Sequence, residues 1–166
     1  LHLLSRRQRQ MCIRDSKKAG VKILNNGHVN YKKNGELIHI YGLEIGKEFF
    51  LIRNRPSMKE DYISGLIGMP LDGYGILIAH NPMFFKQYAA WGADLVFSGH
   101  VHGGIVRLPF AGGVLNPDYT LFPHYDGGEY HEKNSTMLLG RGLGTHTINV
   151  RINNPPELVT AVLHRR

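Results

Sequence analysis

Two short apolar segments, each ending at a histidine, are the feature that most constrains the fold of this chain. Residues 74–82 read YGILIAHNP, and residues 94–104 read DLVFSGHVHGG. Continuous apolar runs of this length are typical of strands that are buried on both faces. Between them, Asn81 and Pro82 supply the N-cap and the first residue of a helix that Gly92 ends. The order strand, helix, strand predicts an α/β fold.

Histidines stand where both predicted strands end, His80 after the first and His100 and His102 after the second. Ligands of α/β proteins collect at the carboxyl ends of the strands, so we expect the three histidines to share one site. Neutral imidazole is a common metal ligand, and three imidazoles without a nearby cysteine suit Mn, Fe or Zn with carboxylate co-ligands. Structural interpretations remain open, because a lone histidine such as His80 usually serves packing and the neighbouring glycines could simply form a tight turn.

The remaining sequence predicts mainly strands. The Asn34-Gly35 pair between two β-prone runs predicts a hairpin. Residues 57–70 predict a helix that ends at Pro70, and residues 48–54 predict a strand or a loop. Further strands are predicted over residues 21–24, 105–108, 135–140, 147–154 and 157–165.

Composition narrows the class of protein. The chain has 166 residues, of which 42% are hydrophobic and 20% are charged, as is typical of one globular domain. The net charge is +7, but no stripe of interleaved basic and aromatic residues indicates a nucleic-acid-binding surface. The charge could attract a phosphate ester or be a generic basic surface. Cys12 is the only cysteine, which excludes an intramolecular disulfide and a cysteine-based zinc site.

The first sixteen residues differ in character from the rest of the chain. They begin with Leu, carry charges where a signal peptide would be apolar, and contain the segment RRQRQMCIRDS, which resembles translated sequencing-adapter sequence. We therefore expect residues 1–16 to be a non-native or disordered leader, with a short basic helix as the alternative. No apolar run in the chain reaches the ~20 residues that span a bilayer.

Four segments together resemble the calcineurin-like metallophosphoesterase family, in particular its bacterial membrane-associated or exported branch. They are AHNP at 79–82, SGHVHGG at 98–104, RGLG at 141–144 and VRINNPPELVTAVL at 150–163. The resemblance implies an α/β/β/α sandwich that is N-terminally truncated here, with residues 17–166 as the C-terminal part of the domain. It implies a membrane-associated or exported protein, attached if at all through a further N-terminal segment, with a cytoplasmic protein as the alternative.

The resemblance also implies a role for each histidine. His80 and His100 would bind one divalent ion and His102 a second, the ions being Mn, Fe or Zn. A hydroxide that bridges the two ions would hydrolyse phosphomonoesters or phosphodiesters, so no protein nucleophile is expected. Arg141 and Asn81 are candidate substrate-binding residues, with an ion pair for Arg141 and a helix cap for Asn81 as the alternatives.

The sequence departs from the family pattern in its N-terminal half. The D-x-H, G-D and G-N-H-[DE] motifs that carry the other metal ligands of the family do not occur in these 166 residues. We therefore expect the two-metal site to be incomplete in this chain. Two alternatives stay open, a non-catalytic fragment that binds one metal ion and a zinc hydrolase with a mononuclear three-histidine site.

Overall fold

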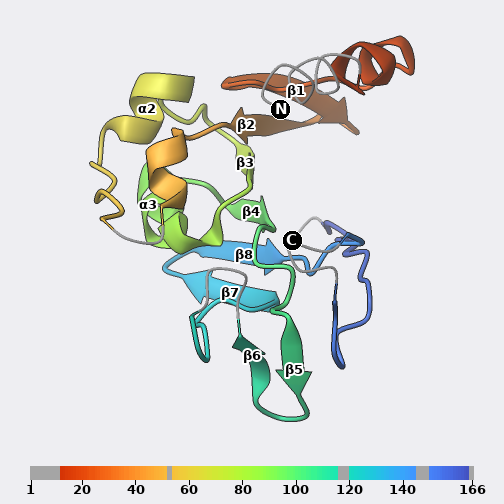
Figure 1. Cartoon of the computed structure of the whole chain (residues 1–166). Coiled ribbons are helices and arrows are strands. Elements are labelled where there is room, and N and C mark those ends of the chain that lie inside the picture. Colours follow the sequence, from red (N-terminus) through yellow and green to blue (C-terminus); the bar gives the residue numbers. More distant parts are fainter. Residues whose placement is uncertain (1–11, 52–53, 116–119, 145–149, 165–166) are drawn as a thin grey trace.

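A computed structural model describes residues 12–51, 54–115, 120–144 and 150–164 (Figure 1). In these ranges the chain forms a six-stranded sheet in the order β1-β2-β3-β4-β8-β7 and a two-stranded sheet of β5 and β6. The strands are β1 Gly27–Lys33, β2 Glu36–Leu43, β3 Tyr74–Ala79, β4 Leu95–Ser98, β5 Val106–Leu108, β6 Gly112–Leu115, β7 Gly128–Glu132 and β8 Ser135–Leu139. The helices are α2 Tyr62–Ile67 and α3 Phe85–Trp91, and two short 3-10 helices are η1 Lys47–Phe50 and η2 Pro82–Phe84. Residues 12–18, which include the end of the expected leader, are also helical.

The large sheet is mixed. The four central strands, β2, β3, β4 and β8, run parallel to one another. The edge strands β1 and β7 pair antiparallel with β2 and β8, respectively. The predicted hairpin is confirmed, with Asn34 and Gly35 at φ values of 53° and 85° between β1 and β2. Both central residues of such a turn need positive φ, which Asn and Gly adopt most easily. The sheet therefore confirms the α/β class.

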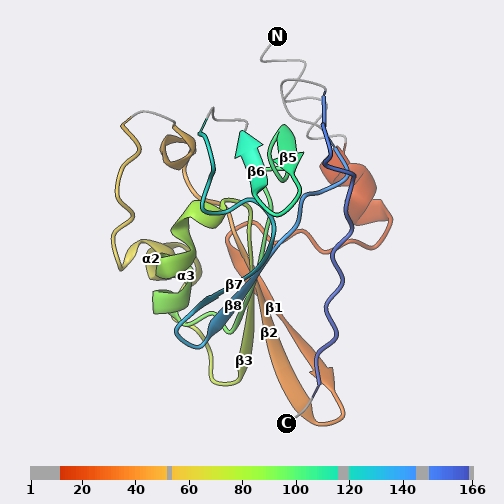
Figure 2. The same ribbon diagram turned by 90° about the horizontal axis from the view of Figure 1, so that it is seen from below.

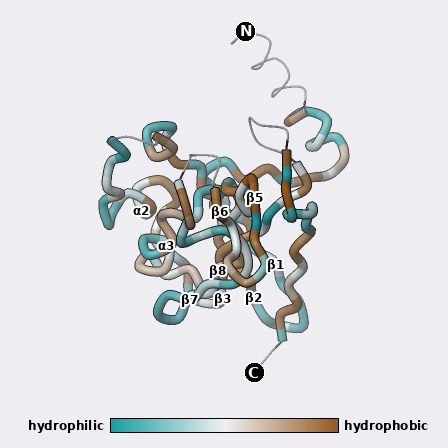
Figure 3. Tube along the Cα trace, turned by 60° about the horizontal axis from the view of Figure 1, so that its bottom comes forward, coloured by the Kyte–Doolittle hydropathy of each residue, from teal (hydrophilic) through white to brown (hydrophobic). Residues whose placement is uncertain are grey.

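Helices cover one face of the sheet. In Figure 2, α2 and α3 lie on one side of the strands, and the C-terminal segment runs along the other side. The covered face holds the main core, where Leu77, Val96 and Met137 are fully buried against Phe85 and Tyr88. Figure 3 shows brown, hydrophobic segments within the sheet, whereas the turns that follow β1 and β7 are hydrophilic.

The opposite face of the sheet is less covered. Ile78 points away from the helices and is 49% exposed, although it lies in a central strand. The described residues thus show one mixed sheet with helices on one face and a small second sheet. The four-layer sandwich stays a prediction. None of the described helices has the length and apolar character that a membrane span requires.

Several predicted elements differ from the structure. Residues 21–24 form no strand, and Leu24 packs directly over Gly42 of β2. Residues 48–50 belong to η1, and only residues 62–67 of the predicted helix 57–70 are helical. Residues 157–164 are irregular, so the predicted strand there is wrong within the described part. Residues 145–149 lie outside the described ranges, and Ile152 forms only an isolated bridge to Val106.

Candidate functional site

The ends of β3 and β4 bring His80 and His100 together. The two strands are parallel neighbours, and each histidine comes within two residues of its strand's last residue. The backbone of Gly99 donates a hydrogen bond of 3.1 Å to the carbonyl of His80, and Ser98 Oγ donates one of 3.2 Å to the same oxygen. The two imidazole rings lie with their centroids 5.2 Å apart and their planes at 73°. The structure thus places these two histidines side by side.

An unusual turn carries His100 and His102. Their φ values are 69° and 50°, and Gly103 and Gly104 follow at 75° and 83°. Left-handed backbone is uncommon for residues other than glycine, costs of order 1–3 kcal/mol, and clusters at functional sites. Between the two histidines, Val101 is only 4% exposed and belongs to the core. The buried valine anchors the turn while the histidines on either side keep partial solvent exposure.

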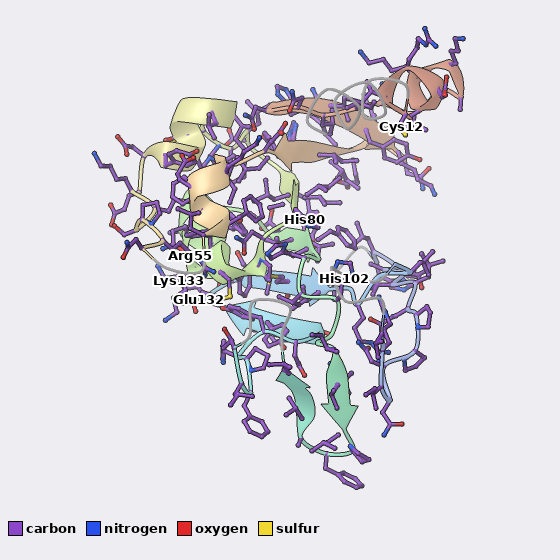
Figure 4. The ribbon with its side chains drawn as sticks, viewed as in Figure 1. Cys12, Arg55, His80, His102, Glu132 and Lys133 are labelled. Carbon is purple, nitrogen blue, oxygen red and sulfur yellow. The ribbon has the colours of Figure 1, made fainter. Side chains whose placement is uncertain are left out.

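His102 is held by the C-terminal part of the chain. Its Nδ1 lies 3.2 Å from the carbonyl oxygen of Gly144, and because a carbonyl only accepts, this bond needs the proton on Nδ1. Figure 4 shows His80 and His102 in the region where β4 and β8 end, away from Arg55 and Glu132. His102 is close enough to His80 for its charge to influence the pKa of that ring.

The environment favours the neutral form of His80. Partial burial lowers the pKa of His80 below its ordinary value, and repulsion from a charged His102 lowers this pKa further. Although His80 keeps contact with solvent, Phe50 of η1 covers part of the site, with ring centroids 5.1 Å from His100 and 6.4 Å from His80. Neutral imidazole is the form that binds metal ions.

The donor set fits part of a metal site. Two imidazoles at this separation can both reach one ion, because metal–nitrogen bonds are about 2.0–2.1 Å long. Within the described ranges, however, no group of three or more His, Cys, Asp or Glu side chains is arranged to hold a metal ion. His80 and His100 therefore fit as two nitrogen ligands, and the described residues do not complete the shell.

Asn81 lies beside His80 but is buried. The side chain accepts a hydrogen bond of 3.1 Å from the backbone of Met83 and so caps η2. Its Nδ2 donates to the carbonyl of Phe49 at 3.2 Å, and the residue is 1% exposed. This arrangement favours the capping role over the substrate contact, which stays a prediction.

Arg141 lies beside the turn as part of an ion pair. Its Nη2 is 2.7 Å from Glu157 Oε1, and the hydrogen bond to Glu157 raises the pKa of the guanidinium. Its aliphatic chain packs on Gly103, where a Cβ would lie 2.7 Å from Arg141 Cδ. The ion pair is thus present, and a phosphate contact by Arg141 stays a prediction.

Sequence reasoning missed three residues that shape this site. Phe50 packs on two histidine rings, and Arg151 and Asn154 bond the backbone around His102. Phe50 stood in a segment that fitted either a strand or a loop, with no local sign of the histidines. Asn154 is 52 residues from His102 in sequence, and no local pattern links the two residues.

Known proteins similar to this chain are metallophosphoesterases and a pyrophosphatase. The uncharacterized metallophosphoesterase YkuE of Bacillus subtilis is 31% identical over 54% of this chain and 31% of its own length. The uncharacterized metallophosphoesterase YkoQ of the same organism is 22% identical over 84% of this chain and 48% of its own length. The UDP-2,3-diacylglucosamine pyrophosphatase LpxG of Chlamydia trachomatis is 30% identical over 51% of this chain and 27% of its own length.

The matched part of the chain spans less than half the length of each of these relatives. No protein-family profile and no solved structure matches the chain. The similarity to the named relatives agrees with the histidine motifs and with the mixed α/β sheet. This chain is related to the calcineurin-like metallophosphoesterases.

Proposed function

We propose that this chain is part of a metal-dependent phosphoester hydrolase in which His80 and His100 bind one divalent ion. The observation that carries the proposal is the pair of rings 5.2 Å apart at the ends of two neighbouring parallel strands. The lowered pKa of His80 supports it, since the ring stays neutral at pH values where an ordinary histidine is partly protonated. A phosphate ester is the substrate class that the relationship supports.

A bound divalent ion would lower the pKa of a water molecule and neutralise charge on the phosphoryl oxygens. Residues of this chain would hold and shield that ion. His80 and His100 would hold the ion, and Phe50 would shield one side of the pair from water. His102, fixed by its bond to Gly144, would hold a second ion of Mn, Fe or Zn.

The proposed two-metal site needs carboxylates that the described residues do not bring to it. We propose that they come from a part of the domain outside these 166 residues, with residues 17–166 as its C-terminal part. The half-exposed Ile78 supports this, because a central strand is normally covered on both faces. A second sheet packed on that face would complete an α/β/β/α sandwich.

A second candidate is a fragment that binds one ion without hydrolysing esters, or a mononuclear zinc hydrolase. The absence of a three-ligand group among the described side chains favours a single weakly held ion. The experiment is a hydrolysis assay with bis(p-nitrophenyl) phosphate in the presence of Mn²⁺ or Zn²⁺. The chain as it stands is compared with the protein extended upstream, and His102→Ala is compared with the exposed-site variant His131→Ala.

The proposal predicts hydrolysis by the extended protein that His102→Ala reduces by at least tenfold and that His131→Ala leaves unchanged. The chain alone should bind metal and show little turnover. No hydrolysis by the extended protein with any of the metals would contradict the proposed function and favour the second candidate.

A further inference from the structure

We propose that Asn154 is a positioning residue for His102. The inference rests on the proposed function, since it concerns how one of the proposed metal ligands is held. Asn154 is 3% exposed and lies 52 residues from His102 in sequence. No feature of the neighbouring sequence requires a buried amide at position 154. The hydrogen bonds that Asn154 makes therefore explain why it is buried.

The amide group of Asn154 holds the turn at two points. Its Nδ2 donates a hydrogen bond of 2.7 Å to the carbonyl of His102 and one of 2.6 Å to the carbonyl of Gly104. The carbonyl between these two, that of Gly103, accepts a bond of 3.0 Å from Arg107 Nη1. Three successive carbonyls of the turn are therefore held by two side chains, the nearby Arg107 and the distant Asn154.

The held backbone is the strained part of the site. His102, Gly103 and Gly104 have φ values of 50°, 75° and 83°, so three residues in a row are left-handed. Glycine adopts positive φ without strain, but a left-handed histidine such as His102 persists only where its surroundings fix it. The two hydrogen bonds of Asn154 hold the carbonyls of the first and last residues of this run. Loss of the donor would remove both bonds.

The same C-terminal segment holds the acceptor of the His102 ring. Nδ1 of His102 lies 3.2 Å from the carbonyl of Gly144, and Arg151 Nη2 donates a short hydrogen bond to that carbonyl. Arg151 Nη2 also donates to the carbonyl of Arg141 at 2.9 Å. Residues 151 and 154 thus fix both the backbone and the ring of His102. A hydrogen bond at one ring nitrogen assigns a metal ion to the other.

The side-chain oxygen of Asn154, unlike the nitrogen, does not stabilise the turn. This Oδ1 atom is buried and has no hydrogen-bond partner among the described residues. An unsatisfied buried acceptor is destabilising, so the residue is not optimised for stability alone. The NH₂ group, which makes both bonds to the turn, is the part that serves the site.

The test compares Asn154→Asp with Asn153→Asp in the chain as it exists. Both variants make the same chemical change at adjacent positions, but Asn153 is exposed. Aspartate has no donor to offer the two carbonyls, and its charge repels them. Three quantities are measured: the thermal midpoint, the ¹⁵N resonances of the His102 ring in chelator-treated protein, and the affinity for Zn²⁺ by titration calorimetry.

We expect Asn154→Asp to shift the His102 Nδ1 resonance and to weaken Zn²⁺ binding by roughly 10- to 100-fold, the usual effect of removing a partner of a metal ligand. Asn153→Asp should leave both quantities as in the wild type. A lowered thermal midpoint with an unchanged ring spectrum and unchanged Zn²⁺ affinity would overturn the proposal, because Asn154 would then be only structural.

The ring spectrum separates this proposal from the proposed function. If the wild type binds no Zn²⁺, the metal-site function fails, while the metal-free spectrum still shows whether Asn154 positions the ring. If Asn154→Asp does not fold, Asn154→Ser is the second variant, because serine adds no charge and is too short to bond both the His102 and the Gly104 carbonyls. A His102 Nδ1 resonance unchanged by Asn154→Ser, or failure of both variants to fold, would overturn the proposal.

Discussion

His80 and His100 lie at the ends of two neighbouring parallel strands with their ring centroids 5.2 Å apart. The pairing follows from the backbone, since Gly99 N donates to the His80 carbonyl at 3.1 Å and ties the two strand ends together. Phe50 packs against both rings. This arrangement places His80 and His100 at the centre of the proposed site.

Gly103→Ala should destabilise the fold more than Gly142→Ala. Both glycines have left-handed φ, 75° and 68°, so either alanine adds backbone strain of about 1–2 kcal/mol. A Cβ at Gly103 would also lie 2.7 Å from Arg141 Cδ, whereas one at Gly142 meets nothing within 4 Å. We expect the free energy of unfolding to fall by roughly 2 kcal/mol more for Gly103→Ala in urea titrations. Equal losses would contradict the close packing at Gly103.

Asn81→Ala should lower the free energy of unfolding by about 2 kcal/mol, because the cap at Met83 and the bond to the Phe49 carbonyl are both lost. Asn81→Ser is the informative partner variant. Serine keeps a capping acceptor but cannot reach Phe49, so we expect about half the loss. If both variants unfold at the same denaturant concentration as the wild type, Asn81 does not have the anchoring role assigned to it.

Glu157→Gln should reduce the acid sensitivity of the fold. The hydrogen bond from Arg141 holds the pKa of Glu157 below its ordinary value of 4.5, so the unfolded state binds more protons than the folded state just below pH 4.5. The pair therefore stabilises the fold above pH 4.5, and this contribution is lost as the pH falls through the folded-state pKa.

We expect Glu157→Gln to lower stability at pH 7 by roughly 1 kcal/mol, a modest value for a partly exposed pair, and to lower it less at pH 3. Unfolding curves between pH 3 and pH 7 measure this dependence. Glu60→Gln, at an exposed position, is the matched control. A stability difference from the wild type that does not change with pH would contradict the assigned ion pair.

Phe50→Ala should raise the pKa of His80 toward its ordinary value of 6.5. Burial is the largest cause of the lowered pKa, and the Phe50 ring supplies part of that burial. Phe110→Ala is the control, because Phe110 is fully exposed at the end of β5. A proton NMR titration of the metal-free protein measures the change. The same His80 pKa in both variants would show that Phe50 does not shield the ring.

The sequence was informative where structure depends on near neighbours. Asn34-Gly35 predicts its hairpin because the turn needs two residues with positive φ. Likewise, the apolar runs before His80 and His100 predict the strands β3 and β4, although β3 is not buried on both faces, since Ile78 is 49% exposed. Asn81, Pro82 and Gly92 bound the helical segment between these strands. The meeting of His80 and His100 follows from those strand ends.

Features that depend on distant contacts were not predictable. Residues 21–24 have the composition of a strand, but they form none, and Leu24 occupies the space over Gly42. Leu158 and Val162 alternate as in a strand, yet both are more than 70% exposed and residues 157–164 join no ladder. The hold of Asn154 on His102 joins residues 52 apart, which no local pattern records.

Titration calorimetry with Zn²⁺ determines whether His80 and His100 bind the same divalent ion. The wild type, His80→Ala, His100→Ala and the control His131→Ala are compared in identical buffer. We expect His80→Ala and His100→Ala each to abolish a binding event that the wild type and His131→Ala retain. Zn²⁺ binding that survives either substitution at the wild-type affinity would contradict this expectation.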